Sequence, residues 1–181
     1  SEVEKLEEEV ERSVRDLERE LRDSEEKSKE LMRRLDELVR RAKDHVRRSV
    51  EELRKTLSKG LDEDEVRDLE RRVREDHEKL KEDLKRIVRE AREALKKHRR
   101  RVEEIVKRVK ERLEELRRRI GDDEEVRRIL RDAERVIEEI KRRLEEDHKR
   151  LEEVIRRVEE KLRRILDEHD KVVKEIKEAL R

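Results

Sequence analysis

Apolar residues recur along this chain in alternating steps of three and four, which is the spacing of one face of an α-helix. In the first third of the chain this stripe consists of Val10, Val14, Leu17, Leu21, Leu31, Leu35, Leu38, Ala42, Leu53 and Leu57. Two further stripes begin at Val66 and Val126 and follow the same rhythm. The pattern predicts three amphipathic helices, over about residues 2–58, 63–119 and 123–180.

The only two glycines separate these three segments. Gly60 has the place of a residue that ends a helix in the left-handed conformation, with Leu61 as the apolar contact after the stop. Asp62 then has the place of an N-cap, and Glu65 follows at the capping-box spacing. The second turn repeats this arrangement with Gly121, Asp122 and Glu125.

The short turns and the width of the stripes predict how the helices pack. Turns of this length place consecutive helices antiparallel. Additional apolar neighbours widen each stripe toward three positions per heptad, so three stripes can close on one another. The predicted fold is all-α: an elongated, up-down-up antiparallel three-helix bundle with coiled-coil-like heptad packing. We expect it to form a single domain over residues 1–181, with turns near Gly60 and Gly121.

Polar residues interrupt the stripes at positions that the fold brings together, because residues equally far from a turn face each other in antiparallel helices. The first predicted layer consists of His45, Ser49, His77 and His169. The second predicted layer consists of Ser24, Ser28, His98 and His148. Corresponding positions in the two layers are 21 residues apart on every helix, which is three heptads. The second layer should therefore repeat the first, with Ser24 in place of His45.

Histidine and serine on buried faces suit a hydrogen-bond network that crosses the helices. A neutral imidazole offers one donor and one acceptor, and a serine hydroxyl offers both. Such a network would fix the register of the helices at some cost in stability. Burial would also lower the pKa of each histidine, so acid should destabilise the fold. The neighbouring Asp44, Asp76 and Asp147 lie about 100° around the helix, and we expect them to be solvated.

Three histidines from three helices also match a metal site with an open fourth position, which suits zinc or copper. The alternative ligands are His45, His77 and His169. We favour the hydrogen-bond network because the second layer has Ser24, a poor ligand, where the first has His45. The sequence analysis therefore expects no metal and no other cofactor.

A catalytic role is not expected for these residues. Ser49, His45 and Asp76 would be the members of a hydrolytic triad, but the interior of a helical bundle offers no oxyanion hole and no cleft. We thus expect no enzyme, no catalytic residue and no small-molecule substrate. A further alternative is a component that supplies three helices to a larger bundle. No stripe is left over for a partner helix, so a monomer is expected.

Composition excludes several classes of function. Charged residues make up 62% of the chain and hydrophobic residues 30%, without any aromatic residue, proline or cysteine. The formal net charge is +1 and both signs are mixed along every segment, so nucleic acid has neither a basic stripe nor an aromatic platform to bind. No apolar run approaches the ~18 residues of a membrane span. We expect a soluble protein, cytoplasmic on recombinant expression, with no membrane partner.

The alphabet is also reduced, because asparagine and glutamine are absent and charged residues fill the polar faces. With its capped short turns and near-equal helix lengths, the chain resembles computationally designed single-chain three-helix bundles over its whole length. This resemblance implies a designed structural scaffold with no natural biochemical activity. In such a scaffold, the two buried layers would set the register and make the stability sensitive to pH.

Overall fold

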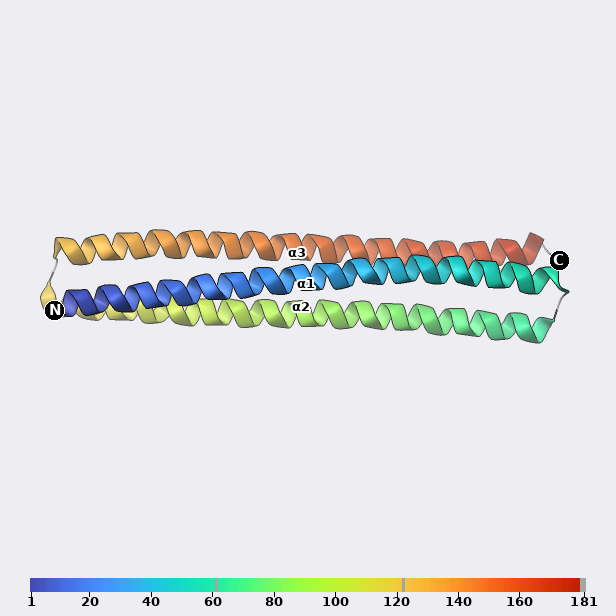
Figure 1. Cartoon of the computed structure of the whole chain (residues 1–181), viewed down its shortest axis with the longest axis horizontal. Coiled ribbons are helices and arrows are strands. Elements are labelled where there is room, and N and C mark those ends of the chain that lie inside the picture. Colours follow the sequence, from blue (N-terminus) through green and yellow to red (C-terminus); the bar gives the residue numbers. More distant parts are fainter. Residues whose placement is uncertain (61, 122, 180–181) are drawn as a thin grey trace. The chain divides into compact units, whose positions relative to one another are not determined.

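The computed structural model describes residues 1–60, 62–121 and 123–179, and these form three α-helices (Figure 1). Helix α1 is Glu2–Ser58, α2 is Glu63–Ile120 and α3 is Glu124–Ala179. Strong helix formers fill these segments, and neither proline nor an internal glycine interrupts them. The all-α fold is confirmed, and the predicted ends of the helices agree with the observed ends to within one residue.

The glycines end α1 and α2 as the sequence predicts. Gly60 has φ 118° and Gly121 has φ 83°, both in the region that favours a residue without a side chain. Asp62 caps α2, because its carboxylate accepts a hydrogen bond from the backbone N–H of Asp64 at 3.1 Å. The contact expected from Leu61 lies outside the described residues.

The cap of α3 differs from the expectation. Asp122, the expected N-cap, lies outside the described residues. Asp123 takes the capping role, since its carboxylate accepts from the backbone N–H of Glu125 at 3.3 Å. Helix α3 therefore begins one residue later than predicted, and Glu125 stands too early in the helix for the expected capping box.

The three helices contribute to two compact units. The first unit consists of Ser1–Glu30 and Ala91–Leu151, and the second consists of Leu31–Glu90 and Glu152–Arg181. Each unit thus contains a segment of α1, a segment of α2 and a segment of α3. The expectation of a single domain over residues 1–181 stays a prediction.

Ion pairs between helices show that α1 and α2 are antiparallel within each unit. In the second unit, Arg34 contacts Glu90 at 2.7 Å and Arg41 contacts Asp83 at 2.9 Å. The residue number of the partner in α2 therefore decreases as the residue number in α1 increases. The first unit shows the same order in the pairs Glu9–Arg112 and Glu20–Arg101. The predicted direction of these helices is confirmed within each unit.

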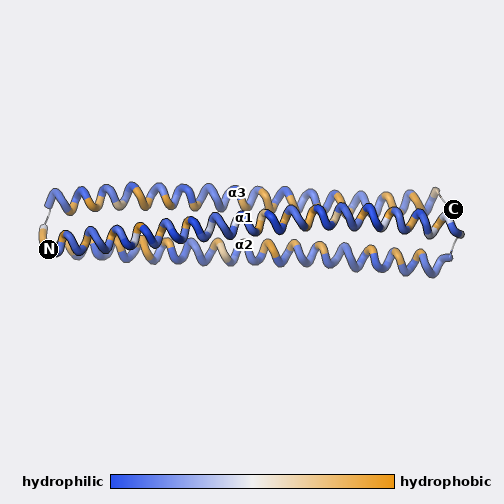
Figure 2. Tube along the Cα trace, viewed as in Figure 1, coloured by the Kyte–Doolittle hydropathy of each residue, from blue (hydrophilic) through white to orange (hydrophobic). Residues whose placement is uncertain are grey.

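The apolar stripes supply the core of each unit, and their recurrence along every helix is visible in Figure 2. In the first unit the buried cluster includes Leu6, Leu17, Leu21, Val102, Leu116, Ile140 and Leu144. In the second unit one buried cluster consists of Leu53, Leu57, Val66 and Leu69. Each such side chain stabilises the fold by about 1.5–3 kcal/mol on burial. Over the residues described, no helix combines the length and apolarity needed to cross a bilayer.

Replacing Gly121 with alanine is expected to destabilise the protein by about 1–2 kcal/mol, because a Cβ is unfavourable at a positive φ. No atom of the described residues lies within 4 Å of the position of that Cβ, so the cost should come from the backbone alone. Urea denaturation would measure it as a lower midpoint at an unchanged slope. Gly121→Asn is the control and should cost less, because asparagine tolerates this conformation. Equal stability of the alanine variant and the parent would contradict the prediction.

Candidate functional site

In the second unit, three histidines from three helices come together, as the sequence predicts. His45 lies on α1, His77 on α2 and His169 on α3, and one ring nitrogen of each lies within 4.8 Å of the other two. The ring centroids are 5.6 Å apart for His45 and His77, and 5.3 Å apart for His45 and His169. We call these three residues the histidine cluster.

Two hydrogen bonds connect the cluster across the three helices. His77 Nε2 lies 2.7 Å from His169 Nδ1, and His169 Nε2 lies 3.0 Å from Ser49 Oγ. His169 is fully buried, with 0% of its surface exposed. Its two ring nitrogens therefore connect a residue of α2 with a residue of α1 in a site that excludes water.

Two carboxylates stand at the margin of the histidine cluster. Asp76 Oδ2 lies 3.4 Å from His45 Nδ1, and Asp170 Oδ1 lies 3.7 Å from His77 Nδ1. Asp76 is 46% exposed, as expected for a solvated residue. His45 is only partly buried, with 19% of its side chain exposed, but its Nε2 is buried and has no hydrogen-bond partner among the described residues.

Burial favours the neutral form of these imidazoles. Desolvation, together with repulsion from His77 and His45, lowers the pKa of His169 to about 4. Desolvation also lowers the pKa of His45 and of His77, although Asp76 and Asp170 oppose it. At neutral pH the ring nitrogens are therefore available as uncharged donors and acceptors.

In the first unit, two serines of α1 bind a carboxylate of α3. Ser28 Oγ donates to Asp147 Oδ2 at 2.8 Å, and Ser24 Oγ donates to the same oxygen at 3.4 Å. All three residues are buried, and Asp147 is only 8% exposed. The expectation of a solvated Asp147 was wrong, because two hydroxyls of the facing helix supply the hydrogen bonds that its carboxylate would otherwise take from water. We call these residues the serine–aspartate cluster.

The histidines of the first unit do not form the network that the sequence predicts. His98 Nδ1 lies 2.8 Å from Glu20 Oε2, and Arg101 contacts the other oxygen of Glu20 at 3.1 Å. Ser24, the expected partner of His98, donates to Asp147 instead. The side chains of His98 and Glu20 are each 12% exposed, so this contact lies at the edge of the core.

His148 is the most isolated of the predicted polar residues. It is 3% exposed, and neither ring nitrogen has a hydrogen-bond partner among the described residues. Desolvation and the nearby Arg99 lower its pKa, while Asp147 and Glu145 oppose them. The first unit therefore does not copy the second, although the spacing in the sequence is the same.

Comparison with known proteins supports the fold. No family model matches the chain, and no curated protein matches it. A solved structure described as "Computationally designed three helix bundle" is similar over 99% of this chain and 90% of its own length, with a TM-score of 0.67. The fold is a three-helix bundle. The two sequences are only 16% identical, so the likeness concerns the fold alone.

The sequence did not predict the contacts of three acidic residues of this three-helix bundle: Asp147, Glu20 and Asp170. Each stands next to a stripe position in the sequence, either just before it or just after it. A residue there lies at the edge of the buried face, where a carboxylate can turn inward if a donor on another helix meets it. An acidic residue beside a polar stripe position is therefore the signal that would have identified Asp147 and Asp170.

Replacing both Ser24 and Ser28 with alanine is expected to destabilise the bundle by roughly 3–5 kcal/mol, because the buried Asp147 carboxylate loses the two hydroxyl donors of its Oδ2 atom. Urea denaturation at neutral pH would measure the loss. The triple variant that also carries Asp147→Leu is the control. It should recover most of the stability, since apolar groups can replace a buried charge without penalty. A double variant as stable as the parent would show that the carboxylate does not depend on these serines.

Proposed function

We propose that this chain is a computationally designed structural scaffold with no natural biochemical activity. Its buried polar residues would fix the register of the helices and make its stability sensitive to acid. We also propose that it works as a monomer, without nucleic acid or a membrane as a partner. The observation that carries the proposal is the contact of Ser24 and Ser28 with Asp147, beside the unpaired His148.

The origin by design is supported by the sequence and by the likeness of fold. The chain lacks asparagine, glutamine, cysteine, proline and every aromatic residue, and 62% of it is charged. Strong helix formers on exposed positions are what a designer selects, because propensity decides where packing does not. The solved structure that shares the fold is itself described as computationally designed.

The role in register follows from what a slipped helix would do. If α1 moved by one heptad in either direction, buried leucines would replace both serines opposite Asp147: Leu17 and Leu21, or Leu31 and Leu35. The apolar face would still match, because the heptad repeat is unchanged. The carboxylate would then be buried without donors, at a cost of roughly 3–5 kcal/mol. The contact of the two serines with Asp147 therefore favours the native register over a register shifted by one heptad. The apolar stripe alone would make these registers nearly equal in stability.

The role in acid sensitivity rests on the position of His148. Its side chain is buried, and among the described residues neither nitrogen has a hydrogen-bond partner to stabilise an added proton. Arg99 and His98 on α2 oppose a positive charge there, while Glu145 and Asp147 on α3 favour it. On α1, the Glu20 carboxylate is already bonded to His98 and Arg101. Burial dominates, and the pKa of His148 falls.

The sign of the pH dependence follows from this lowered pKa. Well above the unfolded pKa of about 6.5, His148 is neutral in both the folded and the unfolded chain and contributes no pH dependence. Below that pH, the unfolded chain binds a proton that the folded chain resists, so folding stability falls as the pH decreases. The loss levels off only below the pKa of the folded state.

The test compares the urea midpoints of the parent and of His148→Leu at about pH 7.5 and about pH 5. The parent should lose more stability than the variant between these two pH values. Acid also affects the other titratable groups, but they are common to both proteins, so the difference isolates His148. An equal loss in parent and variant would contradict the role proposed for His148.

A further inference from the structure

We propose that the histidine cluster of the second unit is a binding site for a single divalent transition-metal ion such as zinc. His45, His77 and His169 would supply one nitrogen each. The sequence favours a hydrogen-bond network without metal, but the geometry of the cluster points to this additional capacity. The inference does not depend on whether the chain was designed.

The three ring nitrogens are already near the separation that an ion requires. They lie within 4.8 Å of one another, the one such group of three among the residues described. Three nitrogens bound to zinc at about 2.0–2.1 Å in a tetrahedral arrangement lie roughly 3.4 Å apart. A separation at the 4.8 Å limit would therefore have to shrink by about 1.4 Å, which rotation of the rings would have to provide. The Nε2 of His77 and the Nδ1 of His169, now 2.7 Å apart, would separate slightly to admit the ion.

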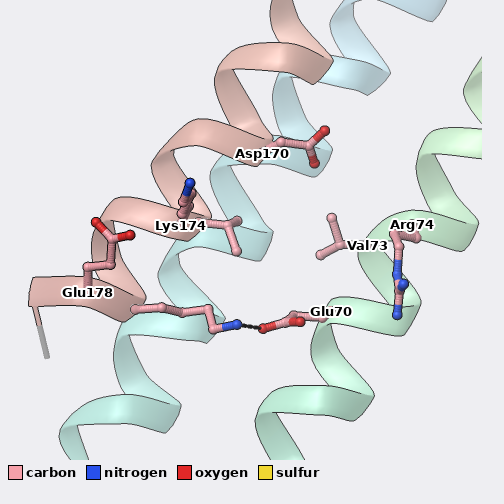
Figure 3. A pocket seen from close by; sticks show the side chains of 8 residues that line it. Glu70, Val73, Arg74, Asp170, Lys174 and Glu178 are labelled. Atoms are coloured by element: carbon pink, nitrogen blue, oxygen red, sulfur yellow. Dashed lines mark ion pairs between the residues drawn. The ribbon is translucent and has the colours of Figure 1, made fainter. Parts of the chain in front are cut away.

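Each ring also has an outer partner on the nitrogen that would not bind metal. For His45 and His77 that nitrogen is Nδ1, and the partners are Asp76 at 3.4 Å and Asp170 at 3.7 Å. Asp170 lines a groove between α2 and α3 and extends from α3 toward α2 (Figure 3). For His169 the outer nitrogen is Nε2, which lies 3.0 Å from Ser49 Oγ. Such outer carboxylate and hydroxyl partners orient metal-binding histidines and fix which nitrogen carries the proton.

The inner nitrogens that remain are Nε2 of His45, Nε2 of His77 and Nδ1 of His169. His45 Nε2 is buried and has no hydrogen-bond partner among the described residues, an arrangement that costs free energy in a dry site. A metal ion at the centre of the cluster would provide the missing partner. Only His169 would have to shift its proton, from Nδ1 to Nε2, if its Nδ1–H donates to His77 in the metal-free protein.

A cavity of about 380 Å³ between α1 and α2 is lined by His45, Ser49 and Asp76, among others, so one of the three proposed ligands borders open space. His77 and His169 do not line this cavity, so an ion would have to pass the His45 ring to reach their nitrogens. The lowered pKa values leave the imidazoles uncharged at neutral pH, so an ion would not have to displace protons from them. Three neutral histidines with an open fourth position suit zinc, and copper(II) should bind more tightly still.

The first unit offers a control within the same chain. Ser24 occupies the position that corresponds to His45, and the other two histidines are His98 and His148. The Nδ1 of His98 is already bonded to Glu20. A site of three histidines therefore cannot form there, and we expect one ion per chain rather than two.

The experiment titrates the metal-free, full-length chain with Zn²⁺ by calorimetry at about pH 7.5, where the histidines are neutral. Cobalt(II) is the spectroscopic probe, because its visible absorption reports tetrahedral coordination. The parent should bind one ion and its thermal midpoint should rise with zinc. His45→Leu should weaken zinc binding by more than about 100-fold, beyond the roughly 10–100-fold expected when only an outer partner is lost. The double variant His98→Leu/His148→Leu should bind as the parent does.

Ser49→Ala tests the role of an outer partner apart from that of the ligands, because it keeps all three histidines and removes only the hydroxyl beside His169. Its zinc affinity should fall by about 10–100-fold, between the parent and His45→Leu. Circular dichroism of each variant verifies that it remains helical. The proposal is overturned if the parent binds no zinc, if His45→Leu binds as tightly as the parent, or if the double variant of the first unit loses binding. Acid sensitivity traced to His148 would be unaffected by any of these results.

Discussion

The loss of water around polar side chains on otherwise apolar helix faces is the constraint on which the rest of the structure depends. Asp147 and His169 are removed from solvent almost completely, and an unpaired polar group in such a place costs several kcal/mol. The hydrogen-bond partners described for them lie on other helices. Ser24 and Ser28 reach Asp147 from α1, and Ser49 reaches His169 from α1. Because the partners lie on other helices, the hydrogen bonds form in one alignment of the segments, whereas the heptad stripe alone would accept several.

The two units satisfy this constraint with different chemistry. A carboxylate only accepts hydrogen bonds, so the serine–aspartate cluster needs donors, and hydroxyl groups provide them with little side-chain volume. A neutral imidazole both donates and accepts, so imidazoles can bond to each other, as His77 and His169 do at 2.7 Å. The first solution buries a carboxylate whose Oδ2 atom accepts hydrogen bonds from two hydroxyls. The second keeps uncharged nitrogens close together, and one of them, His45 Nε2, has no hydrogen-bond partner among the described residues.

Those parts of the fold that depend on spacing within one helix could be predicted from the sequence. The stripes gave the three helices, the two glycines gave the turns, and distance from the turns brought His45, His77 and His169 together. The burial of Asp147 could not be predicted in this way, because a residue at the edge of a stripe turns inward only if a donor on another helix meets it. The one-residue difference between Asp122 and Asp123 has a similar origin, since adjacent aspartates are equivalent candidates until the path of the turn selects one.

Unpaired buried nitrogens have different consequences in the two units because their surroundings differ. His148 stands beside Asp147, whose Oδ2 atom is already bound by two hydroxyls, and beside the positive Arg99. In acid the His148 ring therefore tends to take up a proton, and burial makes this protonation unfavourable in the folded state. His45 instead lies beside two other imidazoles and lines a cavity, so we propose an ion as the partner of all three nitrogens. The same local defect, a buried imidazole nitrogen without a partner among the described residues, thus underlies both proposals: acid sensitivity at His148 and metal binding at the histidine cluster. Burial lowers the pKa of the clustered histidines as well, so the number of imidazoles that the facing helices supply decides where an ion can bind and not where acid acts.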